Sequence, residues 1–239
     1  MNVTFDFTDD VALVTGASGA LGSAVCEEFA EAGATVAAAD MVAPDDEDAE
    51  LDTDRERVHF YEGDCTDESE VERVVSEVTA DHDGLDYLAN IAGTWRGGTP
   101  IEETDAETFD LLFDVNLKTM FLASKHALPH LRESAGGGAI VSVSARSSLE
   151  GGEGDGPYRA SKAGVRLLTE TIAEEHTGEV RANAVMPSVI DTPANREMMP
   201  DADHDKWVDP ADIAETVLVL CSDATGVTSG AAVPVYGEA

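Results

Sequence analysis

Apolar residues are arranged in short uninterrupted runs, separated by longer segments in which they recur with a helical period. An uninterrupted apolar run is typical of a strand covered on both faces of a sheet, whereas a half-exposed strand alternates apolar and polar positions. On this basis we expect seven strands, at residues 11–15, 35–40, 58–63, 87–91, 139–144, 180–185 and 232–235.

Helical patterns lie between most of these runs, near residues 20–32, 67–81, 105–133, 159–176 and 210–221. Asp67 and Asp209 stand at expected N-cap positions, and Pro210 stands at the favoured first helical position. Strands that alternate with helices predict an α/β fold with a doubly wound, seven-stranded parallel sheet. No internal repeat or linker divides the 239 residues, so a single domain over residues 1–239 is expected.

One segment fits neither pattern. Residues 188–208 are rich in Pro and Met and contain Asp201, Asp203 and Asp205. A long irregular segment in a compact domain is often a binding loop or a lid. We therefore expect a substrate loop here.

The charge is extreme, with 49 acidic residues against 14 Lys and Arg and a net charge of −35. Nucleic acid and anionic membranes are poor partners for such a surface. The acids are dispersed between apolar runs, which favours a folded domain over a disordered acidic tail. Dispersed acids combined with few lysines resemble the halophilic proteins of microbes whose cytoplasm is concentrated salt, which would screen the repulsion.

Several classes of protein are disfavoured. The cysteines Cys26, Cys65 and Cys221 are far apart and odd in number, which suggests neither a disulfide framework nor a zinc site. The six histidines show no metal-ligand spacing, so no metal is expected. The first residues do not resemble a signal peptide, and no apolar stretch has the length of a membrane span. We expect a cytoplasmic protein that acts on a small molecule.

A glycine-rich turn follows the first expected strand and runs directly into a helix. Glycine lets the backbone approach a pyrophosphate, and the N-terminus of the helix stabilises the negative charge. This order of strand, turn and helix predicts a dinucleotide site in a Rossmann fold. The expected contacts are Gly16, Ser18, Ala20, Leu21 and Gly22.

Asp40 ends the second expected strand. A carboxylate at this position accepts hydrogen bonds from the adenosine ribose and repels a 2′-phosphate. Residues 41–44 offer no Arg or Lys to hold that phosphate, so NAD is favoured over NADP. The alternative is an ordinary solvated Asp at the end of a strand.

Five ordered motifs together resemble the short-chain dehydrogenase/reductase family over nearly the whole chain. They are Asp64-Cys65, Asn90-Ile91-Ala92-Gly93, Asn116, Tyr158-x-x-x-Lys162 and the segment from Pro187 to Thr192. Two positions depart from the family pattern: Ala20 and Ser188 each stand where the family usually has a glycine. The resemblance implies an NAD(P)-dependent oxidoreductase with catalytic Tyr158, Lys162 and Asn116. Besides Tyr158 and Lys162, it implies cofactor contacts at Asp64, Cys65, Asn90, Ala92, Gly93, Pro187, Val189, Ile190 and Thr192.

Tyr158 and Lys162 are four residues apart and project from one face of a helix. A nearby ammonium is expected to lower the pKa of the phenol, so that Tyr158 exchanges a proton with substrate as hydride is transferred. The resemblance implies that Lys162 also holds the nicotinamide ribose and that Asn116 binds a relay water. The alternative is an ordinary exposed pair on a helix.

The family's catalytic serine is missing, because Ala145 stands at its usual position. Ser144 is one residue earlier, and successive strand residues point to opposite faces. Ser144 is therefore expected to serve only if the backbone shifts. Ser147 and Ser148 are further candidates.

Separate patches near residues 93–98, 145–151 and 191–207 resemble dihydropteridine reductase-like members of the family. Trp95 is expected to stack on a flat substrate and Arg96 to hold its polar edge; a Trp that covers the rim of the core is the alternative. The expected substrate is a small carbonyl or alcohol, or a planar conjugated acceptor such as a dihydropterin. A 3-oxoacyl thioester reductase and a non-catalytic NADH sensor are the alternatives. The resemblance also implies a homotetramer or homodimer formed through helices 105–133 and 159–176.

Overall fold

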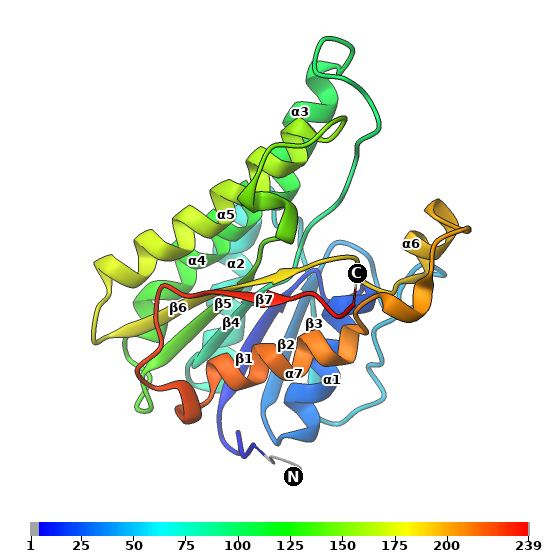
Figure 1. Ribbon diagram of the computed structural model, residues 1–239. Coiled ribbons are helices and arrows are strands. Elements are labelled where there is room, and N and C mark those ends of the chain that lie inside the picture. Colours follow the sequence, from blue (N-terminus) through cyan, green and yellow to red (C-terminus); the bar gives the residue numbers. More distant parts are fainter. Residues whose placement is uncertain (1–4, 239) are drawn as a thin grey trace.

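The computed structural model describes residues 5–238 and contains one seven-stranded sheet (Figure 1). The strand order is β3-β2-β1-β4-β5-β6-β7, and all neighbouring strands are parallel. This confirms the predicted doubly wound sheet. The order changes direction between β1 and β4, where ligands bind in open α/β sheets. The strands are β1 (Val11–Thr15), β2 (Thr35–Asp40), β3 (Val58–Glu62), β4 (Tyr87–Asn90), β5 (Gly138–Val143), β6 (Val180–Pro187) and β7 (Ala232–Val235).

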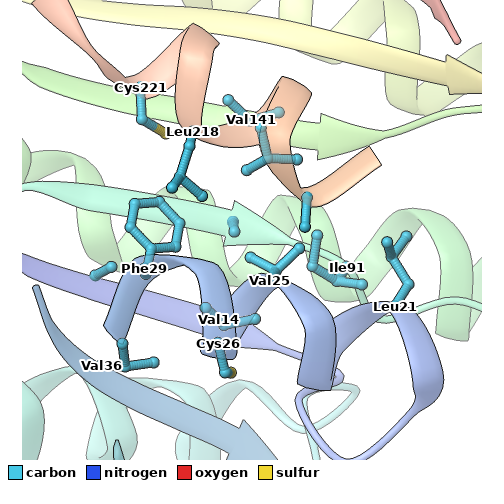
Figure 2. Packing of buried hydrophobic residues seen from close by; sticks show 14 of the residues in the cluster. Val14, Leu21, Val25, Cys26, Phe29, Val36, Ile91, Val141, Leu218 and Cys221 are labelled. Carbon is cyan, nitrogen blue, oxygen red and sulfur yellow. The ribbon is translucent and has the colours of Figure 1, made fainter. Parts of the chain in front are cut away.

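Helices cover both faces of the sheet (Figure 1). They are α1 (Ala20–Glu31), α2 (Glu68–His82), α3 (Ala106–Phe113), α4 (Thr119–Leu131), α5 (Gly156–Glu175), α6 (Pro193–Met198) and α7 (Pro210–Cys221). One core cluster joins α1 and α7 to the sheet, and Figure 2 shows Phe29 and Leu218 in it. A second cluster joins α2, α4 and α5 to the opposite face. Burial on both faces explains why the five inner strands, β1, β2, β4, β5 and β6, have mostly apolar sequences.

The helix boundaries differ from the sequence pattern at two places. The helix expected over residues 105–133 is divided into α3 and α4 by a π-helical turn, Asp114–Lys118. The expected loop at 188–208 contains the short helix α6 and a 3-10 turn, His204–Lys206. Thr192 caps α6 and Pro193 begins it, a signal of a helix start that the sequence analysis overlooked.

The expected caps at Asp67 and Asp209 are confirmed, because both side chains accept hydrogen bonds from amides of the first helical turn. These caps fix the start of α2 and α7 at the positions that the sequence indicates. No helix within residues 5–238 is long and apolar enough to cross a membrane.

Candidate active site

The glycine turn between β1 and α1 is packed so closely that side chains are excluded. Gly16 has φ +70°, and a Cβ there would lie 2.6 Å from the Cα of Ala92. A Cβ on Gly22 would lie 1.9 Å from the carbonyl oxygen of Gly16. Glycine at these two positions therefore lets α1 and the end of β4 both approach the turn.

The N-terminus of α1 suits an anion. Gly19 stands at the N-cap and provides no side-chain hydrogen bond, and the first turn, which begins with Ala20 and Leu21, contains no acidic residue. An uncapped N-terminus presents backbone N–H groups and a positive dipole end. The turn thus fits the pyrophosphate of a dinucleotide, even though the chain has 49 acidic residues.

Asp40 is fixed against this turn by two amides. Its Oδ2 accepts from the N–H of Ser18 at 2.9 Å, and its Oδ1 accepts from the N–H of Val42 at 3.0 Å. The Ser18 hydroxyl donates to the carbonyl of Val42 at 2.6 Å. The carboxylate therefore lies where β2 ends, beside the glycine turn, in the position expected of a group that binds ribose.

Asp64 and Cys65 follow β3 on the same side of the sheet. Asp64 accepts hydrogen bonds from the N–H and hydroxyl of Thr66, at 2.8 and 2.7 Å. Burial, together with the nearby carboxylates of Asp40, Asp64 and Glu70, raises the pKa of the Cys65 thiol to about 12. Cys65 thus remains a neutral thiol, suited to an apolar contact with adenine.

Residues at and just after the end of β4 form two separate sets of hydrogen bonds, one inside the core and one to Thr15. The Asn90 amide donates to the hydroxyls of Ser124 and Ser142, at 3.2 and 3.1 Å, inside the core. Its role visible here is to join β4, β5 and α4. Beyond it, the Thr15 hydroxyl accepts from the N–H groups of Ile91 and Ala92, at 3.3 and 3.4 Å.

Lys162 and Asn116 converge on Gly93. A Cβ on Gly93 would lie 3.0 Å from the Lys162 Nζ and 3.1 Å from the Asn116 Oδ1. The Lys162 ammonium donates to the carbonyl of Val143 at 2.9 Å, and burial lowers its pKa to about 8. Asn116, in the π-helical turn, accepts from the N–H of Thr94 at 2.7 Å.

Tyr158 lies one turn before Lys162 on α5, half-buried, and within residues 5–238 its phenol has no hydrogen-bond partner. Burial, followed by the Asp155 carboxylate, raises its pKa to about 12, while the Arg159 guanidinium opposes the rise. This corrects the expectation that Lys162 lowers the pKa of Tyr158 in the chain by itself. The ammonium is instead held by the carbonyl of Val143, while the phenol is partly buried.

Two of the serine candidates, Ser144 and Ser148, contact groups other than the Tyr158 phenol. The Ser144 hydroxyl donates to the carbonyl of Lys162 at 2.8 Å, and the Ser148 hydroxyl faces the sulfur of Met186 at 3.9 Å. Ala145 is buried and begins the 3-10 turn Arg146–Leu149. A catalytic role of Ser144 stays a prediction, and it would require this hydrogen bond to break.

The expected substrate side is formed by two loops. After Pro187, at the end of β6, the chain returns through Val208, whose N–H donates to the carbonyl of Val189 at 2.9 Å. Ile190 pairs with Val208, and Thr192 caps α6. The second loop, after β4, carries the exposed Trp95 and Arg96.

All the expected site residues thus belong to the carboxyl ends of the parallel strands and the helices that follow them. Three groups that the sequence analysis did not single out join them: the Thr15 hydroxyl, the Thr94 amide and the Val143 carbonyl. Backbone groups leave no signal in a sequence, whereas Thr15 directly precedes the glycine turn. Within residues 5–238, no group of three or more His, Cys, Asp or Glu is arranged to hold a metal ion.

Comparison with known proteins identifies the family. The model of the short chain dehydrogenase family matches residues 10–203. The chain belongs to the short-chain dehydrogenase family. It is accordingly an oxidoreductase of that family, whose members typically use a nicotinamide cofactor.

Similar proteins cover nearly the whole chain. The cis-4-hydroxycyclohexanecarboxylate dehydrogenase of Sinomonas cyclohexanicum is 32% identical over 241 residues, which are 97% of this chain and 96% of that protein. A 3-oxoacyl-(acyl-carrier-protein) reductase of Thermotoga maritima is 31% identical, over 95% of this chain and 96% of that protein. The aldohexose dehydrogenase of Thermoplasma acidophilum has a similar structure, with a TM-score of 0.85, 27% identity and coverage of 97% and 94%.

Proposed function

We propose that this enzyme transfers hydride between NAD(H) and a small ring-shaped carbonyl, alcohol or planar conjugated acceptor, with Tyr158 as the acid. One observation carries the proposal. Lys162 and Asn116 converge on Gly93, and Tyr158 stands one helical turn from Lys162 with a phenol that forms no hydrogen bond to any described residue, 5–238.

The residues present fit a nicotinamide dinucleotide, which supplies the hydride when bound. We assign the pyrophosphate to the glycine turn and the N-terminus of α1, and the adenosine ribose to Asp40. Ala92, Gly93, Pro187, Val189, Ile190 and Thr192 are proposed to line the nicotinamide side. NAD is favoured because residues 41–44 contain no basic side chain for a 2′-phosphate.

Tyr158 is proposed to donate its proton to the substrate oxygen or nitrogen as hydride adds to the other atom of that double bond or conjugated system. A phenol with a pKa near 12 is fully protonated at neutral pH, which suits reduction. Lys162 is proposed to stabilise the phenolate left behind once the cofactor is bound, since in the chain by itself its ammonium donates to the carbonyl of Val143. Asn116 fixes the loop after β4 through the Thr94 amide and holds the geometry around Lys162.

The substrate class follows from two features at the mouth. Ala145 provides no hydroxyl to polarise a simple carbonyl, which favours an acceptor that is already activated by conjugation. Trp95 is 41% exposed and offers a flat face, and stacking adds about 0.5–1.5 kcal/mol beyond burial. A dihydropterin-like or quinone acceptor meets both conditions, and a relative that acts on a hydroxycyclohexanecarboxylate supports a ring.

A 3-oxoacyl thioester reductase is the second candidate, because one similar protein carries that name. Ala145 counts against it. A third possibility, an NADH sensor without turnover, is opposed by the retained Tyr158 and Lys162. The halophilic surface, the cytoplasmic location, the single domain over residues 1–239 and a homodimer or homotetramer stay predictions from the sequence.

A substrate panel tests the proposal. Quinonoid dihydropterin, a quinone, cyclopentanone and an acetoacetyl thioester are each assayed with NADH and NADPH in molar KCl, with Tyr158→Phe as the matched control. We expect the highest kcat/KM with NADH and a planar acceptor. Tyr158→Phe should keep NADH binding and lose turnover by about 10²–10⁴-fold. A higher kcat/KM on the thioester would favour the second candidate, and NADH binding without any turnover would favour the sensor.

A further inference from the structure

We propose that the Arg159–Asp155 ion pair is a positioning device that fastens both loops of the substrate mouth to the helical turn that carries Tyr158. The proposal rests on the function proposed above. It assigns to two residues outside the expected site the placement of substrate relative to the phenol.

Arg159 fills the centre of the loop between β5 and α5. Its Nε lies 2.5 Å from the Asp155 Oδ1, and its Nη1 donates to the carbonyls of Glu150 and Ser147, at 3.2 and 3.4 Å. A Cβ on Gly152 would lie 2.2 Å from the Arg159 Cζ, so the loop is closed around the guanidinium. One side chain thereby ties this loop to the first turn of α5.

Asp155 extends the device to the loop after β4. A Cβ on Gly97 would lie 2.8 Å from Trp95 Cζ2 and 3.2 Å from Asp155 Cβ. The N–H of Gly98 also donates to the carbonyl of Gly154 at 2.8 Å. The loop that carries Trp95 therefore packs directly on the residues that Arg159 holds.

The same two residues place opposite charges beside the phenol. Asp155 disfavours the Tyr158 phenolate and raises its pKa, and Arg159 favours it and lowers the pKa. Two further charged groups lie near this turn: Lys162, further along α5, and Glu150, directly after the 3-10 turn, whose carboxylate raises the pKa of Arg159. Removal of either member of the pair should therefore shift the titration of Tyr158, in opposite directions for the two members.

The chain contains a matched control on the same helix. Arg166 and Glu170 form an ion pair with the same i,i+4 spacing, also 2.5 Å between Nη1 and Oε1, but more than one turn beyond Lys162. Arg166→Gln removes an arginine from an ion pair on α5 without touching either loop of the mouth. Any general effect of losing a helical ion pair appears in this variant too.

Steady-state kinetics on the best acceptor of the panel, measured against pH, test the proposal. Arg159→Gln should raise the acceptor KM by about 10-fold or more, because small misplacements of substrate are costly, while the Kd for NADH changes less than about 2-fold. Its pH midpoint for Tyr158 should move up, and that of Asp155→Asn should move down. Arg159→Lys keeps the charge but not the fork of donors, so it should restore the midpoint but not the KM.

Hydrogen exchange gives a readout without turnover. Arg159→Gln and Asp155→Asn should each speed amide exchange in residues 94–99 as well as 146–156, and Arg166→Gln in neither. Faster exchange confined to residues 146–156, or parental KM and midpoint in both Arg159 variants, would overturn the inference. Full turnover by Tyr158→Phe would instead refute the proposed function and leave the loop result standing.

Discussion

The Ser144 hydroxyl donates to the carbonyl of Lys162 at 2.8 Å, while the Lys162 ammonium donates to the carbonyl of Val143 at 2.9 Å. The end of β5 and the middle of α5 are therefore joined by two hydrogen bonds that run in opposite directions. This arrangement uses Ser144 to position Lys162 and leaves Ala145 at the register of the family's serine.

Variants at residues 144 and 145 should separate two roles of a hydroxyl at the end of β5: positioning Lys162, and polarising the substrate carbonyl as the family's serine does. Ser144→Ala is expected to keep turnover within about 3-fold and to lose about 1 kcal/mol of stability, the usual worth of one hydrogen bond. Ala145→Ser should raise kcat/KM on an unconjugated ketone such as cyclopentanone more than on a quinone. Assays of both variants on both acceptors check this. Loss of turnover by Ser144→Ala, with its fold intact, would make Ser144 catalytic.

Lys162→Met should abolish turnover and raise the free energy of unfolding at pH 7. Burial lowers the pKa of Lys162 from 10.5 to about 8, so the folded chain binds fewer protons than the unfolded chain between these values. Below about pH 8 the ammonium is charged in both states, and folding bears the full cost of burying it. As pH rises from about 8 to 10.5, this cost disappears.

Removal of the ammonium is therefore expected to stabilise the fold at pH 7, by about 1–3 kcal/mol after the loss of the bond to Val143. Denaturant unfolding of parent and variant across pH 7–10.5 measures it. The difference should shrink as pH rises above 8, and turnover should be lost throughout. A variant less stable than the parent at pH 7, with a gap that does not change with pH, would contradict the assigned cost of burial.

Asp40 is expected to set the preference for NADH, but it also holds the glycine turn through the Ser18 amide. Asp40→Asn removes the charge and keeps one oxygen acceptor, so it should raise kcat/KM with NADPH while keeping the turn. Asp40→Ala should in addition weaken both cofactors. The parent should favour NADH by about 10-fold or more, or 1.4 kcal/mol. Equal efficiency of the parent with both cofactors would remove Asp40 from this role.

The sequence predicts those features that depend on side-chain pattern. Apolar runs located all seven strands within two residues at either end, because the five inner strands are mostly buried on both faces; β3 and β7, at the edges of the sheet, are only partly buried. The π-helical turn around Asn116 was missed because it continues the helical period, and α6 was missed because six residues show too little periodicity.

The site divides in the same way. Residue types and order indicate Tyr158, Lys162 and Asn116, but the carbonyl of Val143 and the amide of Thr94 leave no trace in a sequence. Nor does spacing alone give the pKa of Tyr158, because burial raises this pKa more than the neighbouring Arg159 guanidinium lowers it. Desolvation depends on tertiary packing, which a pattern along the chain does not record.

The net charge of −35 leads to a prediction about salt. Within residues 5–238, ion pairs engage 11 of the 49 acidic residues, so most carboxylates there have no cation within ion-pair distance. Salt weakens both the attraction in the pairs and the repulsion among the rest. Exposed ion pairs contribute little, about 0–1 kcal/mol each, to the free energy of unfolding. Salt should therefore stabilise the fold, because it weakens the repulsion among acids more than it weakens these pairs.

We therefore expect the unfolding temperature to rise with KCl. The Debye length falls from about 10 Å at 0.1 M to about 3 Å at 1 M, so most of the screening gain should come below 1 M. Salt exclusion from the surface, in contrast, continues to add stability at higher concentrations. Calorimetry from 0.05 to 3 M KCl separates the two by the shape of the curve. A midpoint that stays constant or falls between 0.05 and 1 M would contradict the halophilic interpretation, since the repulsion it invokes would then be too weak to affect folding.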